Sequence, residues 1–99
     1  MRALYFKVLN FFLKSYLFHY TQATYKIYGC NHRVKFGKGV NVNNAFFNTA
    51  SGEIIIGDYS FCGHSCFFIT GTHDIDKQDK ERQTTIPESG RDIVVGQGV

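Results

Sequence analysis

The sequence predicts a mainly β fold, a parallel β-helix that follows one N-terminal α-helix. Residues 3–20 contain neither glycine nor proline and are dense in Leu, Phe and Tyr, as expected of a helix. From residue 36 a six-residue period replaces the helical one. With 99 residues, of which 43% are hydrophobic, the chain has room for one small ordered domain. We expect an N-terminal helix and connector over residues 1–33 and a β-helix domain over residues 34–99.

The predicted helix is apolar around most of its circumference. Lys7, Asn10 and Lys14 are spaced so that they form one narrow polar stripe. Such a helix buries its remaining surface against the domain, against a second chain or in a membrane interface, and its pattern leaves these alternatives open. The polar stripe interrupts the apolar run, so neither a membrane span nor a signal peptide is predicted. Residues 21–35 form a connector with a turn at Gly29.

The six-residue units begin with an apolar residue, which glycine usually follows, and most carry a small fifth residue. They cover residues 36–41, 42–47, 56–61 and 62–67, and a shortened unit covers 95–99. Short strands joined by tight turns at this period coil the chain into a β-helix, with the first and fifth residues pointing inward. We attribute the glycine to the backbone freedom that a corner needs. Phe46 breaks the fifth-position pattern, and the two-residue slip between Phe47 and Ile56 predicts a bulge or insertion.

Charge is segregated along the chain. Residues 1–52 hold seven Lys and Arg and no acid, whereas the remainder holds eight acids and four bases. A basic, aromatic front half indicates attraction to an anionic surface, or else only a solvated face. No nucleic-acid-binding motif accompanies it, so no nucleic-acid partner is expected.

The three cysteines, Cys30, Cys62 and Cys66, predict a reducing compartment rather than a disulfide framework. Cys62 and Cys66 fall at inward first and fifth positions, so we interpret them as core residues. Their spacing does not suit zinc, and no metal is expected. His64 lies between them at an outward position.

Residues 56–74, IGDYSFCGHSCFFITGTHD, resemble the hexapeptide-repeat acyltransferases. They are most similar to the O-acetyltransferases of sugars and surface polysaccharides, such as the maltose and galactoside acetyltransferases. Ile93–Val99 matches the start of that family's return strand, so the resemblance covers residues 34–99. It implies a left-handed β-helix, here incomplete, that forms homotrimers with active sites between subunits.

The resemblance also implies an acetyl-CoA-dependent O-acetyltransferase of the cytoplasm, held at the inner membrane face if residues 2–20 bind lipid. His73 is then the general base that takes a proton from a sugar hydroxyl. Asp74 and Asn43 are candidate substrate-binding residues, although both residue types also suit turns. Residues 75–92 form a charged excursion loop.

The family's acetyl-CoA site is built largely from later coils, which places it mostly beyond Val99. We therefore expect a truncated chain. The alternative is a degenerate, non-catalytic module with a structural or oligomerising role.

Overall fold

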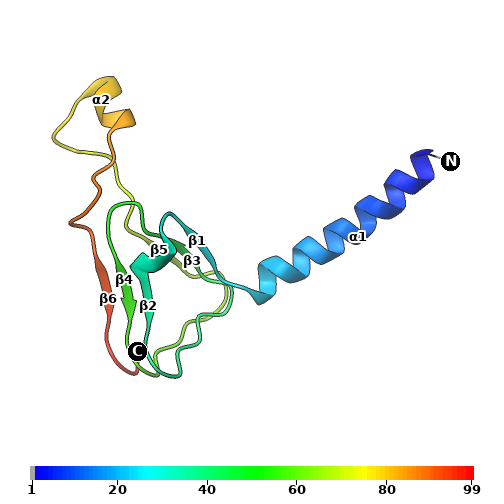
Figure 1. Cartoon of the computed structure of the whole chain (residues 1–99), viewed down its shortest axis with the longest axis horizontal. Coiled ribbons are helices and arrows are strands. Elements are labelled where there is room, and N and C mark those ends of the chain that lie inside the picture. The colour runs from blue at the N-terminus through cyan, green and yellow to red at the C-terminus, as the bar shows by residue number, and fades with distance from the viewer. Residues whose placement is uncertain (1) are drawn as a thin grey trace.

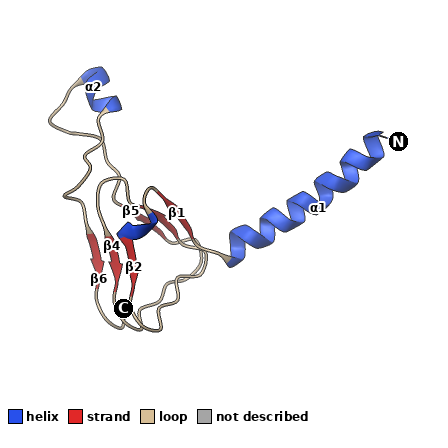
Figure 2. Cartoon of the chain, in the orientation of Figure 1, coloured by secondary structure: helices blue, strands red, loops and turns tan. Residues whose placement is uncertain are grey.

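The computed structural model describes residues 2–99, except for the side chains of residues 21–23. A long helix, α1 (Arg2–Ala23), precedes a body of six short strands (Figure 1). The strands are β1 (Lys26–Tyr28), β2 (Val34–Phe36), β3 (Phe46–Asn48), β4 (Ile54–Ile56), β5 (Phe67–Ile69) and β6 (Ile93–Val95). A 3-10 turn, η1 (Asn31–Arg33), precedes β2, and a short helix, α2 (Asp79–Thr84), lies between β5 and β6 (Figure 2).

The strands form two parallel sheets, with the orders β1-β3-β5 and β2-β4-β6. Successive strands alternate between the sheets, so the chain returns to each sheet after a full turn. Lys26 pairs with Phe46 and Phe46 with Phe67 in one sheet, while Val34 pairs with Ile54 and Ile54 with Ile93 in the other. A parallel bridge between Asn41 and Phe61 stacks a third side. The predicted β-rich body of stacked parallel strands after an N-terminal helix is therefore present.

Strand pairing begins before the predicted boundary at residue 34. β1 lies within the segment expected to be a connector, and each of its residues pairs with β3. The segment Lys-Ile-Tyr carries no glycine-containing hexad, so its sequence shows no repeat. Its place in the sheet depends on Ile27, which packs against the core beside Phe47.

The core is a column of side chains between the sheets. Phe47 and Ile54 are fully buried, and Val42 and Ile56, which lead predicted hexads, are buried with them. Phe47 stacks on Phe68 of the next turn with ring centroids 5.1 Å apart. Burying an aliphatic or aromatic side chain of this kind stabilises a fold by about 1.5–3 kcal/mol, so the column supplies most of the favourable packing.

The exceptions in the repeat have a structural explanation. The six-residue count places Phe46 at the fifth position, where a small inward residue is expected. In the structure the fully buried Ala45 takes that place. Ala45 and Cys66 stand at equivalent places because Phe46 pairs with Phe67. The corner before Ala45 is one residue shorter than the corner before Cys66. Phe46 therefore points outward and packs against Phe67, with ring centroids 5.8 Å apart.

The glycines at the second hexad position serve a different purpose from the one predicted. The left-handed backbone lies two residues later, at Gly39, Tyr59 and Gly98, with φ of 66°, 61° and 69°. A Cβ on Gly57 would lie 2.6 Å from the backbone of Gly96 in the next turn. At Gly37 and Gly57 glycine is needed because the next turn approaches closely, whereas a Cβ on Gly63 would meet nothing within 4 Å. None of these glycines has a positive φ, so the expectation of backbone freedom at the second position was wrong.

Helix α1 points away from the strands (Figure 1). All of its described side chains, residues 2–20, are exposed to solvent. Packing against the domain, one of the three predicted ways to bury this helix, is therefore not what the structure shows. No helix within residues 2–99 is both long and apolar enough to cross a membrane.

Candidate functional site

His73 stands where the chain leaves the stacked strands. β5 ends at Ile69, and Thr70, Gly71 and Thr72 lead from it to an exposed His73. The buried Thr70 fixes this exit, since its hydroxyl donates to the Asn48 carbonyl at 2.8 Å and accepts from the Ser51 N–H at 3.1 Å. The imidazole makes no hydrogen bond within residues 2–99, whereas the backbone on its N-terminal side is firmly held. His73 is thus an accessible ring on an anchored backbone.

Ser51 holds both ends of the excursion that His73 begins. Its hydroxyl accepts the Thr72 N–H at 3.3 Å, and its carbonyl accepts the Arg91 N–H at 3.1 Å. Ser51 is fully buried in the preceding turn of the chain. The sequence alone does not mark Ser51 as a functional residue, because a serine outside the hexads carries no signal of its own. Its position explains how a charged loop leaves and re-enters the stack without disturbing the strands.

Asp74 closes the excursion with its backbone and caps a turn with its side chain. Its N–H donates to the Thr85 carbonyl at 2.9 Å, and its Oδ1 accepts the Asp76 N–H at 3.0 Å. This is the turn-capping arrangement that aspartate favours in loops. The carboxylate that was predicted to contact substrate is thus partly engaged in shaping the loop after His73.

The excursion is an ordered structure built on α2. Arg82 of α2 is bonded to the arm that precedes the helix, since the guanidinium donates to the Lys77 carbonyl at 2.7 Å and to the Ile75 carbonyl at 3.1 Å. Of the four bases that the loop offers to an anionic group, Arg82 is therefore used structurally. Lys77 and Lys80 are exposed on the same loop, as is Arg91 at the point of return.

Asn43 precedes β3, whereas His73 follows β5, and Asn43 lies at a corner of the stack. Its φ is 51°, in the left-handed region that asparagine tolerates. Its side-chain amide donates to the Cys62 carbonyl of the next turn at 2.6 Å. The next residue, Asn44, is buried and accepts the Ser65 N–H at 2.7 Å. Both asparagines therefore connect successive turns, and Asn43 also has the left-handed corner backbone of the turn interpretation. Within residues 2–99 no contact places Asn43 beside His73.

Cys62 and Cys66 face the interior, as their hexad positions predicted. Both pack against the core cluster, and the Cys62 thiol lies 3.3 Å from the Val42 carbonyl. Burial, and to a lesser extent the neighbouring Cys66, raises the pKa of the Cys62 thiol. His64 is exposed. Among residues 2–99 no group of three or more His, Cys, Asp or Glu side chains is placed to hold a metal ion.

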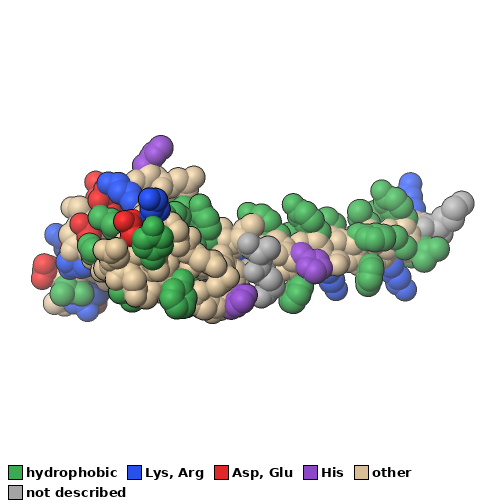
Figure 3. All heavy atoms as spheres, turned by 90° about the horizontal axis from the view of Figure 1, so that it is seen from below, with side chains coloured by type: hydrophobic (Ala, Val, Ile, Leu, Met, Phe, Trp, Pro, Cys, Tyr) green, Lys and Arg blue, Asp and Glu red, His purple; other side chains and the backbone are tan. Residues whose placement is uncertain are grey.

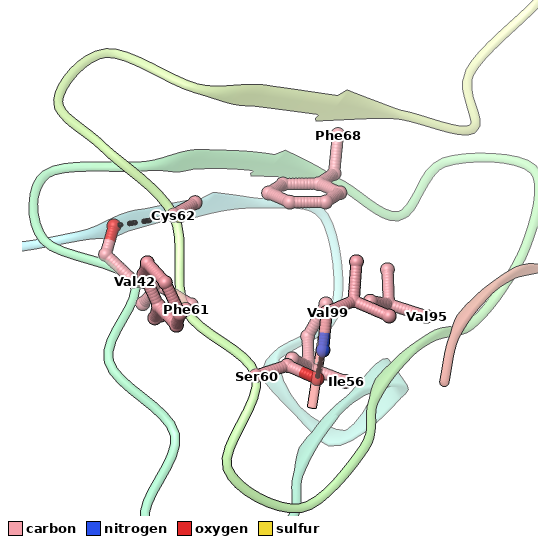
Figure 4. A pocket seen from close by; sticks show the side chains of 8 residues that line it. All are labelled: Val42, Ile56, Ser60, Phe61, Cys62, Phe68, Val95 and Val99. Atoms are coloured by element: carbon pink, nitrogen blue, oxygen red, sulfur yellow. Dashed lines mark hydrogen bonds between the residues drawn. The ribbon is translucent and has the colours of Figure 1, made fainter. Parts of the chain in front are cut away.

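A cavity of about 170 Å³ lies at the end of the stack formed by the last turn of the chain. Its lining is almost entirely apolar and comes from both sheets, with Phe68 on one side and Val95 and Val99 on another (Figure 4). The Ser60 hydroxyl lies at its wall, accepting the Val99 N–H at 3.1 Å and donating to the Gly96 carbonyl at 2.6 Å. The second polar group of the lining, the Cys62 thiol, lies 3.3 Å from the Val42 carbonyl, so both polar groups already have backbone partners.

Comparison of the chain with protein-family models, with curated proteins and with solved structures finds no significant match.

Proposed function

We propose that this protein is an O-acetyltransferase that moves an acetyl group from acetyl-CoA to a hydroxyl of a sugar or surface polysaccharide. The proposal includes a left-handed β-helix of the hexapeptide-repeat type as its fold. The observation that carries it is the placement of His73. An exposed imidazole stands on a backbone anchored to the preceding turn, at the mouth of an ordered excursion, within the sequence context that resembles this enzyme family.

The chemistry requires a group that removes one proton. His73 takes the proton from the acceptor hydroxyl as its oxygen attacks the thioester carbonyl. The carbon–sulfur bond then breaks, the thiol of CoA leaves with a proton returned from the imidazolium, and no acyl-enzyme forms. Neutral imidazole suits this task near neutral pH. Asp74 contributes by shaping the turn that follows His73, since its Oδ1 accepts the Asp76 N–H.

A second subunit supplies the remaining wall of the site in this proposal. His73 is exposed within one chain, and a base of this kind works best where water is excluded. A homotrimer, as the resemblance implies, encloses it between neighbouring subunits.

The test measures acetylation of oligosaccharide acceptors by mass spectrometry, with acetyl-CoA as donor and the protein as encoded. His73→Ala is expected to lower turnover by about 10²–10⁴-fold, the usual value of general-base catalysis. His64→Ala is the matched control, since His64 is also exposed but lies at another corner of the stack. Turnover of His73→Ala within about tenfold of the parent enzyme would overturn the assignment of the base.

The second candidate function is that of a non-catalytic, oligomerising module. The exposed strands and the apolar cavity at the end of the stack favour this function. β5 and β6 are the outer strands of their sheets, and the apolar cavity opens between them. Outer strands of this kind pair readily with another chain. This role predicts a concentration-dependent oligomer in analytical ultracentrifugation that Val99→Asp disrupts, together with no acetyl transfer by the parent protein.

A further inference from the structure

Helix α1 presents a long apolar surface that no other described part of the chain covers. Between Leu4 and Tyr20, twelve large hydrophobic side chains are each 40–69% exposed. The helix has 22 residues and is therefore about 33 Å long. Figure 3 shows hydrophobic side chains on opposite flanks of the helix. Soluble proteins rarely expose a continuous apolar area of this size unless it binds something.

The charges of the helix indicate what it binds. Arg2, Lys7 and Lys14 are basic, and the first acidic residue of the chain is Glu53. Glu53 lies 3.5 Å from Lys35 on the strands and therefore pairs with a base outside the helix. The helix thus combines cationic and apolar side chains with no acid of its own, which complements a lipid surface with anionic headgroups.

The distribution of these side chains favours a membrane interface over a second helix. Lys7, Asn10 and Lys14 share one narrow stripe, while aromatic and aliphatic residues occupy most of the remaining circumference, with Ser15 and His19 among them. A partner helix covers one strip of another helix and would leave the other apolar flanks in water. An interface covers the whole apolar arc at once and leaves the lysines at the headgroups.

The junction with the strands lets the helix lie on a surface while the stack stays in water. Lys26 donates to the Thr24 carbonyl at 3.0 Å, and its ammonium lies 5.4 Å from the centre of the Tyr20 ring. These contacts hold the end of α1 at the first turn of the stack, from which the helix points away (Figure 1). His73 takes part in none of these contacts, so the lipid-binding proposal does not rest on the proposed catalysis.

We propose that α1 is an interfacial anchor that lies in the plane of an anionic lipid membrane, with Lys7 and Lys14 at the phosphates and the aromatic arc among the acyl chains.

Flotation of the intact protein with vesicles tests the binding, because bound protein rises with lipid whereas aggregates sink. Vesicles of phosphatidylcholine mixed with phosphatidylglycerol are expected to bind the protein more tightly than phosphatidylcholine alone. Lys7→Gln with Lys14→Gln is expected to weaken that binding by about fivefold per lysine. The control is Lys77→Gln with Lys80→Gln, which removes the same charge from the excursion and is expected to leave binding unchanged. Absence of flotation, or flotation indifferent to phosphatidylglycerol and to the helix lysines, overturns the proposal.

A tryptophan scan tests the orientation, since the chain contains no Trp. Phe12→Trp lies on the apolar arc, and Asn10→Trp lies on the polar stripe between the lysines. With brominated acyl chains in the vesicles, the fluorescence at position 12 is expected to be quenched more than that at position 10. Equal quenching at both positions, or a lipid-independent dimer in ultracentrifugation that hides both from quencher, assigns α1 to a different partner and overturns the interfacial orientation.

Discussion

The hydroxyl of Ser51 accepts the backbone N–H of Thr72 at 3.3 Å, one residue before His73. Ser51 belongs to the corner between β3 and β4, whereas Thr72 follows β5 one turn later. The hydrogen bond therefore connects the turn that precedes the candidate base to the turn that carries it. Through this contact the buried interior of the stack determines where an exposed imidazole stands.

Ser51→Ala tests that relationship. Removing the hydroxyl leaves the Thr72 N–H without its acceptor in a partly buried place, which we expect to lower the free energy of unfolding by about 1–2 kcal/mol. Hydrogen exchange of the Thr72 amide is expected to quicken more than that of the strand amides. Thr84→Ala, which removes an exposed hydroxyl on α2 that bonds only within its helix, is the control. Unchanged exchange at Thr72 would contradict the role given to Ser51.

Gly57→Ala tests the close approach of successive turns. A methyl group at residue 57 would lie 2.6 Å from the backbone of Gly96, which has to move away. The expected loss in free energy of unfolding is about 1–3 kcal/mol, measured by urea denaturation. Gly63→Ala is the matched control, because a Cβ on Gly63 meets nothing within 4 Å and is expected to be neutral. Equal effects of the two substitutions would show that the spacing between turns does not restrict position 57.

Tyr59 is a test of backbone strain. Its φ is 61°, in the left-handed region that glycine occupies at the equivalent positions Gly39 and Gly98. A β-branched residue tolerates this region worst and asparagine tolerates it well, so Tyr59→Ile is expected to destabilise the fold by about 1–2 kcal/mol more than Tyr59→Asn. Thermal unfolding of the two variants measures the difference. Since both lose the tyrosine ring, equal melting temperatures would refute the strain argument.

Cys62 gives the stability a dependence on pH. Burial, followed by the neighbouring Cys66, raises the pKa of its thiol above the ordinary value of 9.0. The unfolded chain then loses this proton at a lower pH than the folded chain does. Below pH 9.0 the protonated Cys62 thiol therefore makes its whole contribution to the free energy of unfolding. That contribution decreases as the pH rises above 9.0. Urea unfolding on either side of pH 9.0 is expected to show a smaller loss for Cys62→Val than for the parent protein. A parallel loss in both would argue against this source of the pH dependence.

The relative reactivity of the cysteines tests whether the Cys62 thiol is buried. Cys30 is exposed and reaches solvent, whereas Cys62 and Cys66 pack against the core. A thiol-specific reagent is expected to modify Cys30 first, because the thiolate is the reactive form and burial disfavours it at Cys62. Mass spectrometry of peptides after brief labelling identifies the modified residue. Modification of Cys62 as fast as Cys30 would contradict its burial.

Hexad counting predicted the interior of the middle of the stack, whereas the first-position Phe36 and the fifth-position Val99 are exposed. Val42, Ile56 and Cys62 lead their units and face inward, as expected. The counting failed at Phe46, where one corner is a residue shorter and Ala45 faces inward instead. It also missed β1, because Lys26–Tyr28 has no glycine to mark a repeat and becomes a strand only by pairing with β3.

The candidate site shows the same division. His73, Asp74 and Asn43 were chosen from local sequence, and the structure places the first two at the exit from β5 and Asn43 at a corner between turns. Neither Ser51 nor Arg82 carries a sequence signal, because each acts by bonding backbone groups that folding brings to it. Hydrogen bonds to a carbonyl or an N–H depend on where the chain passes and on no particular residue type there.

By itself the sequence determined the helix of residues 3–20, the period of the strands, most of the inward residues and the cationic front half, because each of these is a property of residues close together in the chain. Only the tertiary structure decided that α1 stands clear of the strands, that β1 starts the stack, and that Gly57 is pressed against Gly96. The last two features arise from contacts between successive turns, about twenty residues or more apart in the chain. The distance between turns is set by how the turns pack on one another, so it cannot be predicted from the sequence of any single turn.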